Sequence, residues 1–316
     1  MNLQATTADF NELLIMAKNG NALAQYNLGL MYDNGEGIDQ SYVKAFEWYS
    51  KAANQGYVNA QYNLGVMYNN GEGIDQSYTK AFEWYSKAAN QGYVNAQYNL
   101  GVMYQNGHSV QKNDAKAVEW YSKAADQGHI KAQNNLGVMY AKGQNYTKAV
   151  DWYSKAADQG HVDAQFNLAV MYVKGQGVQK DDVKAVYWYN KAANQGDAGA
   201  QNNLGVMYET GRGVLKDDAK AVYWYSKAAD QGDAGAQNNL GVMYAKGQGV
   251  GQNTALANEW YSKAADQGDV NAQYNLGVMY ENGDGVDQSY AKAVNWYLKA
   301  ANNGHNQAKL MLSRLQ

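Results

Sequence analysis

Few residues in this sequence have the types and spacing that chemistry requires. Four histidines are present, and His129, His161 and His305 share one position of a repeat, in the turn before a predicted helix. His129 and His161 lie in adjacent repeats, roughly 10 Å apart at helix-packing distances, which is too far to share a metal ion without rearrangement. We interpret them as exposed turn residues. The serines have no recurring His and acidic residue beside them, so a catalytic triad is unsupported.

Glycine-rich acidic loops, such as NGEGID at 34–39 and NGDGVD at 282–287, offer a second kind of chemistry. Their carboxylates lack the ligand spacing of an EF-hand. Because no strand precedes the GxG, these glycines are expected to turn the chain and not to cradle a phosphate. The sequence contains no cysteine, which excludes thiolate catalysis, a disulfide framework and a cysteine zinc site. We therefore expect no catalytic residue, no metal and no cofactor.

The elements that position these residues are set by a repeat. Tryptophans recur 36 residues apart, except for one gap of 32 between Trp120 and Trp152. An array of such units packs each repeat on its neighbours and forms one continuous body. The fourth repeat has a shorter loop than the others. We place the eight repeats at 21–56, 57–92, 93–128, 129–160, 161–196, 197–232, 233–268 and 269–304.

Each repeat predicts two helices, which we call helix A and helix B. In the first repeat, helix A covers about 22–33, and its apolar side chains at helical spacing form a buried stripe. Helix B is expected to bury Trp48, Tyr49 and the alanines around them. Gly35 is predicted to end helix A in a left-handed cap. Helix B begins after residues of the N-cap class at one position of every repeat, namely Ser41, Ser77, Asn113, Asn145, Asp181, Asp217, Asn253 and Ser289.

A glycine in the middle of helix A needs a separate explanation. Gly29 and its equivalents follow the leucine that recurs in the buried stripe of every repeat, and the fifth repeat has Ala169 in place of the glycine. Glycine inside a helix costs about 1 kcal/mol relative to alanine. We therefore predict that another helix backbone approaches helix A closely at this point, since only a very small side chain would fit.

The two ends of the array differ from its repeats. Residues 8–20 align with a lone helix B that has Glu12 at the tryptophan position, and residues 305–316 align with a lone helix A that has Arg314 at a valine position. Polar residues in place of stacking residues are what the terminal caps of a solenoid need. We expect an all-α solenoid with an N-terminal capping helix in 1–20, eight repeats in 21–304 and a C-terminal capping helix in 305–316.

The repeat resembles that of a known family. The strings A-x-x-N-L-G-x-M-Y-x-x-G-x-G-[VI] and K-A-x-x-W-Y-x-K-A-A-x-Q-G are similar to the Sel1-like repeat, a relative of the tetratricopeptide repeat, across 21–304. The resemblance implies a right-handed superhelix with helices A on the concave side and helices B on the convex side. Two departures are the absence of proline from the A–B loops and the short fourth loop. Bacterial origin is also implied.

The resemblance implies an adaptor that binds other proteins without catalysis. Some bacterial relatives resemble immunity proteins that neutralise a toxin, and this is the first alternative. The second is an enzyme, since one cysteine-rich branch of the family is linked to β-lactam binding or hydrolysis. That branch carries a disulfide in each repeat, and the absence of cysteine argues against membership.

Helix A has an outward face on which we place the partner. Its three rows correspond to positions 26, 27 and 30 of the first repeat. An asparagine row can pair with a peptide backbone, and exposed apolar rows are typical of contact surfaces. The alternative is structural, with Asn bonding the neighbouring repeat and Tyr and Val packing between helices A. The asparagine row is Asn27, Asn63, Asn99, Asn135, Asn167, Asn203, Asn239 and Asn275; the aromatic row is Tyr26, Tyr62, Tyr98, Asn134, Phe166, Asn202, Asn238 and Tyr274; the aliphatic row is Leu30, Val66, Val102, Val138, Val170, Val206, Val242 and Val278.

Charge and hydropathy limit the class of partner and the compartment. The net charge of −3 gives no basic field for nucleic acid. Lys142, Lys174, Arg212 and Lys246 make the middle repeats locally basic between acidic ends, which predicts a partner with an acidic segment, although a solvated rim is the alternative. The N-terminus lacks a signal-peptide pattern and no apolar run approaches ~18 residues. We expect no membrane insertion and a monomer, cytoplasmic as written, or periplasmic or secreted if a leader was removed.

Overall fold

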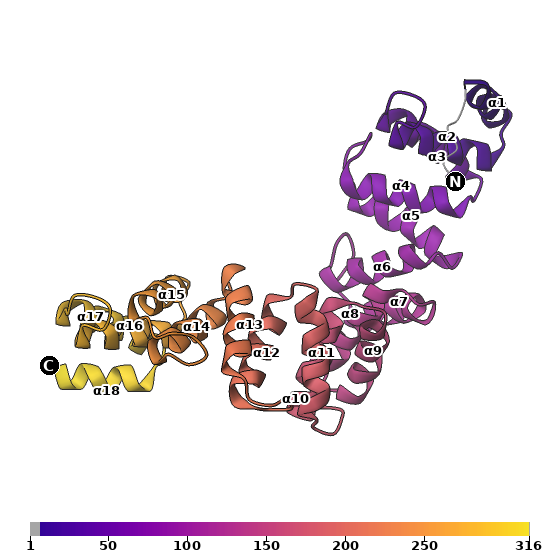
Figure 1. Cartoon of the computed structure of the whole chain (residues 1–316). Helices are drawn as coiled ribbons and strands as arrows, with labels where there is room; N and C mark the ends of the chain where they lie inside the picture. The colour runs from indigo at the N-terminus through magenta and orange to yellow at the C-terminus, as the bar shows by residue number, and fades with distance from the viewer. Residues whose placement is uncertain (1–6, 316) are drawn as a thin grey trace. The chain divides into compact units, whose positions relative to one another are not determined.

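The computed structural model describes residues 7–315, and in this range the chain is all helical (Figure 1). Eighteen helices follow one another, with no strand between residues 7 and 315. The predicted all-α solenoid of eight repeats is confirmed. Residues 1–6 of the predicted N-terminal cap and Gln316 of the C-terminal cap lie outside the described residues. The helices are α1 Thr7–Lys18, α2 Ala22–Asn34, α3 Tyr42–Asn54, α4 Val58–Asn70, α5 Tyr78–Asn90, α6 Val94–Asn106, α7 Asp114–Asp126, α8 Ile130–Lys142, α9 Tyr146–Asp158, α10 Val162–Lys174, α11 Asp182–Asn194, α12 Ala198–Thr210, α13 Asp218–Asp230, α14 Ala234–Lys246, α15 Thr254–Asp266, α16 Val270–Asn282, α17 Tyr290–Asn302 and α18 Asn306–Leu315.

Two compact units divide the chain, Met1–Asn145 with α1 to α8 and Tyr146–Gln316 with α9 to α18. We call them the N-terminal unit and the C-terminal unit. Within each unit, every helix packs against the next one along the chain. The short interhelical loops account for this order, because they leave successive helices no other neighbour within reach.

Helix boundaries follow the predicted capping chemistry. Gly35 lies in the left-handed region at φ 73°, and its N–H donates to the carbonyl of Met31. Ser41 accepts a hydrogen bond from the backbone N–H of Lys44 and so satisfies a free donor at the start of α3. Side chains at the same position cap the other B helices for which the cap is described, namely Ser77, Asn113, Asp181, Asp217, Asn253 and Ser289.

The glycine of helix A makes room for a tyrosine ring. A Cβ added to Gly29 would lie 2.5 Å from Cδ1 of Tyr49. Tyr49 is fully buried against α2. The predicted close contact at this glycine is present, but the prediction that a helix backbone makes it was wrong. The neighbour is the flat tyrosine ring of helix B in the same repeat. Ala169 packs in the same buried cluster as Tyr189, so the fifth repeat accommodates one methyl group.

The tryptophans are less uniformly buried than predicted. Trp48 and Trp224 are buried, at 9% and 7% exposure, whereas the other six are half-buried. The lysine three residues on lies over the ring, with Lys51 Nζ 3.9 Å from the ring centroid of Trp48. Lysine stems cover apolar surface and leave the ammonium group in water. Each indole therefore has one face in the repeat and one face under a lysine.

A buried glutamine joins each repeat to the one before it. Gln25 is 5% exposed, and its Nε2 donates to the carbonyl of Ala17 at 3.0 Å. Its Oε1 accepts from Nε2 of Gln55 at 2.7 Å. These bonds satisfy the buried amide and fix the register of successive hairpins. The sequence analysis assigned no role to this position, which recurs as the buried Gln61, Gln97, Gln133, Gln165, Gln201, Gln237 and Gln273.

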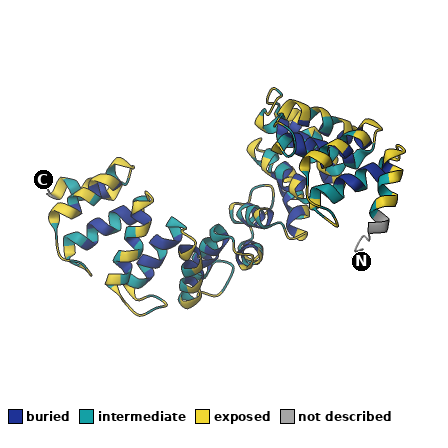
Figure 2. Cartoon of the chain, turned by 90° about the horizontal axis from the view of Figure 1, so that it is seen from above, coloured by how far each residue is buried: buried dark blue, intermediate teal, exposed yellow. Residues whose placement is uncertain are grey.

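The terminal helices pack on the repeats through one side. In α1, Phe10 and Leu13 pack against a cluster that includes Leu28 and Trp48. In α18, Ala308 is fully buried against the cluster of Tyr297. Figure 2 shows the resulting pattern, in which buried residues line the inside of each hairpin and exposed ones cover loops and helix ends.

Candidate functional site

The predicted partner-binding residues lie on one face of the A helices. We call this surface the A-face and define it as Tyr26, Asn27 and Leu30 with their equivalents in every repeat. Most of its residues are half-buried, so these present part of their side chains to solvent. Val138 is the most exposed valine of the A-face at 41%, and Asn134 and Asn238 are buried at 7% and 8%. The face is neither occluded nor freely exposed.

In the N-terminal unit, the A-face is built on aromatic joints between repeats. The ring of Tyr26 lies 5.0 Å from that of Tyr57, centroid to centroid. Tyr62 and Tyr93 repeat the pair at 4.8 Å, and Tyr98 stacks on His129 at 4.5 Å. In each pair the second residue precedes the A helix of the following repeat. Offset aromatic pairs of this kind stabilise an interface by ~0.5–1.5 kcal/mol beyond their buried area.

The asparagine row takes part in the same joints. Burial raises the pKa of Tyr26, and a hydrogen bond with Asn63 of the following repeat opposes that shift. Asn63 also bonds Tyr49, whose pKa is raised chiefly by burial. The structural role weighed for this row in the sequence analysis is therefore present in the N-terminal unit. It does not occupy the whole A-face, since the asparagines remain half-exposed.

In the C-terminal unit, amide joints replace two of the aromatic ones. Asn239 Nδ2 donates to Oδ1 of Asn202 at 3.0 Å, and Asn275 makes the same bond to Asn238 at 3.0 Å. The last repeat returns to the aromatic form, with Tyr274 stacked on His305 at 4.4 Å. The asparagine row thus contacts the preceding repeat through either a phenol or an amide.

A second position sets the polarity next to the A-face. In four repeats the buried tyrosine of helix B donates its hydroxyl proton to the side chain at the position of Asp33. Tyr49 donates to Asp33 at 3.0 Å, and Tyr225 donates to Glu209 at 2.6 Å. In the fourth, fifth and seventh repeats the acceptor is replaced by Ala141, Val173 and Ala245. The tyrosines of those three repeats consequently have no carboxylate or amide acceptor at this position.

Hollows open on the A-face at three places, each lined by an asparagine of the row. One of about 620 Å³ in the N-terminal unit is lined by Asn99 together with Tyr62 and Tyr98, near the start of the A helices. Two in the C-terminal unit, of about 330 Å³ and about 210 Å³, are lined by Asn203 and Asn275 and lie beside the buried tyrosine of helix B. Predicted residues from neighbouring repeats are therefore brought together within each unit.

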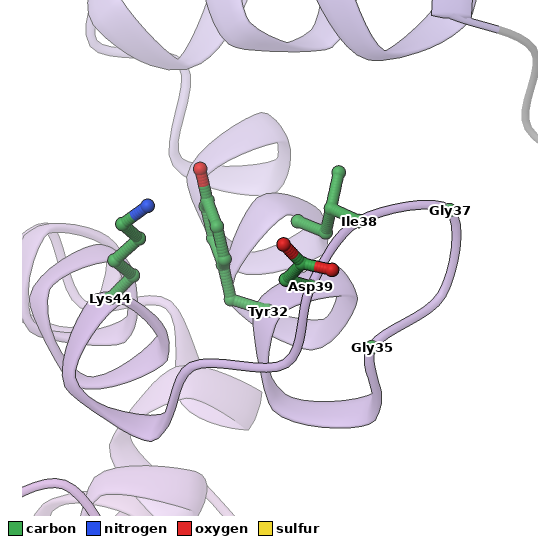
Figure 3. A pocket seen from close by; sticks show the side chains of 6 residues that line it. All are labelled: Tyr32, Gly35, Gly37, Ile38, Asp39 and Lys44. Carbon is green, nitrogen blue, oxygen red and sulfur yellow. The ribbon is translucent and has the colours of Figure 1, made fainter.

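Another hollow lies off the A-face, at the loop of the first repeat (Figure 3). Tyr32 stands between Lys44 of α3 on one side and the neighbouring Ile38 and Asp39 of the loop on the other. Lys44 Nζ lies 5.1 Å from the ring centroid of Tyr32. Its glycines turn the chain at φ 73° and 75°, as predicted for the GxG. It brings together one acidic and one basic group without a nucleophile.

The histidines are not plain exposed turn residues, so that interpretation was wrong. His129, His161 and His305 are half-buried, and each accepts a backbone N–H through Nδ1 at the start of a helix A. Asp197, Asp233 and Asp269 make the same cap with a carboxylate. This capping role could have been predicted from the sequence, because His and Asp, which can both accept a hydrogen bond, share one position of the repeat. Among residues 7–315, no three His, Asp or Glu side chains are grouped to hold a metal ion.

The basic residues of the middle repeats are partly paired. Arg212 holds Asp182 through Nε and Nη2 at 3.1 and 2.7 Å. This pair lowers the pKa of Asp182. Lys142 Nζ lies 3.7 Å from Oδ2 of Asp114 in the N-terminal unit, with both side chains largely exposed. Lys174 is exposed at the edge of the larger C-terminal hollow.

This chain belongs to the Sel1 repeat family, whose repeat matches residues 22–57, 58–93, 94–129, 130–161, 162–197, 198–233, 234–269 and 270–305. It is similar to a protective antigen of uropathogenic Escherichia coli with an SLR fold, at 39% identity and TM-score 0.90 over 96% of this chain and 66% of that chain. It is also similar to a Sel1 repeat protein from Oxalobacter formigenes, at 35% identity and TM-score 0.73 over 99% of this chain and 92% of that chain. The chain therefore spans just under two thirds of the length of the antigen, 66%. No curated protein matches it.

The family sets a coarse functional class. Sel1 repeat proteins are generally non-catalytic scaffolds for protein interaction. An immunity protein of Pseudomonas aeruginosa is a more remote neighbour, at 22% identity and TM-score 0.42, so it does not bear on function here. None of the helices between residues 7 and 315 is both long and apolar enough to cross a membrane.

Proposed function

We propose that this chain is a non-catalytic scaffold that binds a protein or peptide on the A-face of its repeats. One observation carries the proposal: three hollows, one in the N-terminal unit and two in the C-terminal unit, are each lined by an asparagine of the row. A half-exposed amide beside apolar side chains can bond a peptide backbone while neighbouring pockets receive its side chains. The hydrogen bonds that Asn99, Asn203 and Asn275 make to the preceding repeat occupy part of each amide and hold its orientation.

Affinity capture with the full chain from a bacterial lysate tests this proposal. The test variant combines Asn99→Ala, Asn203→Ala and Asn275→Ala, which removes the asparagine of the row from each of the three hollows. The matched control combines Glu83→Ala, Glu119→Ala and Glu259→Ala, three exposed positions on B helices. We expect the captured protein to be lost with the test variant and kept with the control.

Two results would count against the proposal. If the test variant remains helical by circular dichroism and keeps the affinity of every captured partner, the A-face is not the binding surface. If a nitrocefin assay shows turnover by the purified chain, the non-catalytic assignment is wrong. The expected result is no nitrocefin hydrolysis above buffer.

A further inference from the structure

The larger hollow of the C-terminal unit lies where a repeat lacks its usual carboxylate or amide. It is formed by α10 and α11 of the fifth repeat and by α12 with the loop of the sixth. Val173 stands where Glu209 stands one repeat later. Glu209 accepts the hydroxyl proton of Tyr225, whereas valine cannot accept the proton of Tyr189. The space that a longer acceptor would fill is left open.

A buried hydroxyl points into this hollow. Tyr189 is 3% exposed and lines the cavity. Its oxygen accepts a hydrogen bond from Nδ2 of Asn203 at 3.2 Å. Within residues 7–315 its proton is donated to no acceptor, unlike that of Tyr225. Burial raises the pKa of Tyr189 to about 12, so the hydroxyl is protonated at neutral pH and remains a donor. A buried donor without an acceptor favours a ligand that brings one.

The walls and the rim of the hollow differ in chemistry. Val170, Val173, Val206 and Met207 give it an apolar wall within about 330 Å³, room for an aliphatic side chain. Lys174 and Arg212 supply positive charge at the rim. Arg212 is held in place by Asp182 through two of its five donors. The remaining donors and the exposed ammonium of Lys174 are available to carboxylates.

The seventh and eighth repeats form an equivalent hollow with the opposite rim charge. Ala245 takes the place of Val173 and Tyr261 the place of Tyr189. Asp284 lines that cavity at the position of Arg212. The chain therefore contains its own comparison, in which the tyrosine, one valine and the methionine are kept, Gln252 and Thr254 join the lining, and the charged residue at the position of Arg212 changes sign.

We propose that the hollow between the fifth and sixth repeats binds an aliphatic side chain from an acidic peptide segment of the partner. The side chain packs on the valines, and neighbouring carboxylates meet the Tyr189 hydroxyl, Arg212 and Lys174. This assignment rests on the proposed function, because it names the chemistry of the peptide that the A-face receives. Charge complementarity selects the occupant, since an acidic segment is favoured at this rim and disfavoured at Asp284.

A display library of short random peptides, selected on the full chain, provides the probe. We expect the selected peptides to combine leucine, isoleucine or valine with adjacent Asp or Glu. Val173→Glu should weaken the selected peptides about tenfold or more, because its carboxylate fills the hollow and satisfies Tyr189 as Glu209 satisfies Tyr225. The matched control Val43→Glu makes the same substitution at an exposed position of α3, outside these hollows, and should leave their affinity unchanged. Arg212→Asp keeps the cavity open and should also weaken them.

The outcomes separate this inference from the proposed function. If peptides are selected and depend on Asn99, Asn203 and Asn275 but are unaffected by both Val173→Glu and Arg212→Asp, the pocket assignment is wrong and the A-face proposal stands. Selection of basic or purely polar peptides would also overturn the pocket assignment. If no peptide is selected, the pocket assignment fails, and affinity capture with the asparagine variant decides the A-face proposal separately. If Val173→Glu unfolds the chain, Arg212→Asp alone tests the pocket assignment, because it changes a surface-loop residue and leaves the packed helices unaltered.

Discussion

The N-terminal and C-terminal units solve the same packing problem with different side chains. In the N-terminal unit, the ring of Tyr62 contacts that of Tyr93 across a repeat boundary. In the C-terminal unit, Asn202 receives a hydrogen bond from Asn239 across an equivalent boundary, where the following repeat begins with Asp233. Each tyrosine at this position is followed by an aromatic cap residue, and two of the three asparagines by an aspartate cap; Phe166 before Asp197 and Asn134 before His161 depart from this pairing. The backbone repeat is constant, but the joint between repeats has two alternative chemistries.

The comparison shows that neighbouring positions in such an array change as sets at six of the eight joints. A tyrosine at the first position is paired with an aromatic ring on the next repeat, whereas Asn202 and Asn238 are paired with an amide donor. Nearest-neighbour interfaces carry much of the stability of a solenoid, so a mismatched set should destabilise it.

The largest effect on stability is expected when an asparagine of the C-terminal type of joint is placed in an aromatic joint of the N-terminal unit. Tyr62→Asn removes the ring that contacts Tyr93 and Tyr85 and should lower the free energy of unfolding by about 2 kcal/mol, since a half-buried aromatic and its stacking are lost. Chemical denaturation followed by circular dichroism measures the change.

A compensating substitution sharpens this test. Adding Tyr93→Asp to Tyr62→Asn recreates the C-terminal type of joint, because Asn99 is already present to donate. The double variant should recover about 1 kcal/mol relative to the sum of the two single variants. Strict additivity would mean that the two positions do not act as a set.

A smaller effect on stability is expected at Glu209, the position at which the sixth repeat has an acceptor and the fifth has Val173. Glu209→Ala removes the acceptor of Tyr225, which is fully buried, and should cost about 1–2 kcal/mol, the usual penalty for an orphaned buried donor. In a Tyr225→Phe background the same substitution should cost nearly nothing. An equal cost in both backgrounds would show that Glu209 stabilises the repeat by another route.

Much of the fold was predictable because each element is specified locally. The positions of Gly35 and Ser41 follow from backbone groups at helix ends that any helix must satisfy, so the boundaries needed no tertiary information. The period of the tryptophans gave the hairpin pattern directly. The burial of Trp84 was overestimated, because a lysine covering one face of an indole cannot be recognised from apolar spacing.

The site was harder to predict because its residues act across repeat boundaries. The side chain of Gln61 hydrogen-bonds to Gln91 and to the carbonyl of Ala53, which lie 30 and 8 residues away outside its own helix. The periodicity of one helix does not reveal such bonds. The hollow at Val173 depends on a residue that is absent from one repeat and present in the next. Only the aligned three-dimensional neighbours show that this substitution opens space beside Tyr189 and not to bulk solvent.

The smallest expected effect concerns pH and the cap of α8. His129 Nδ1 accepts the N–H of Ala132, which requires the neutral ring. Burial, reinforced by Lys131, lowers the pKa of His129 below its usual value. The unfolded chain therefore takes up a proton near pH ~6.5 while the folded chain does not, so the stability contributed by this group decreases as the pH falls below that value.

The variant His129→Asn isolates this contribution, since asparagine caps a helix without titrating. It also loses the stacking on Tyr98, so its stability should be lower at every pH, and the informative quantity is the difference between two conditions. We expect the urea midpoint of the unchanged chain to fall more between about pH 7.5 and about pH 5.5 than that of the variant. His161 and His305 are present in both chains and cancel. Equal falls would mean that the cap tolerates a protonated ring, and that the stacking on Tyr98 is the main role of His129 at the joint.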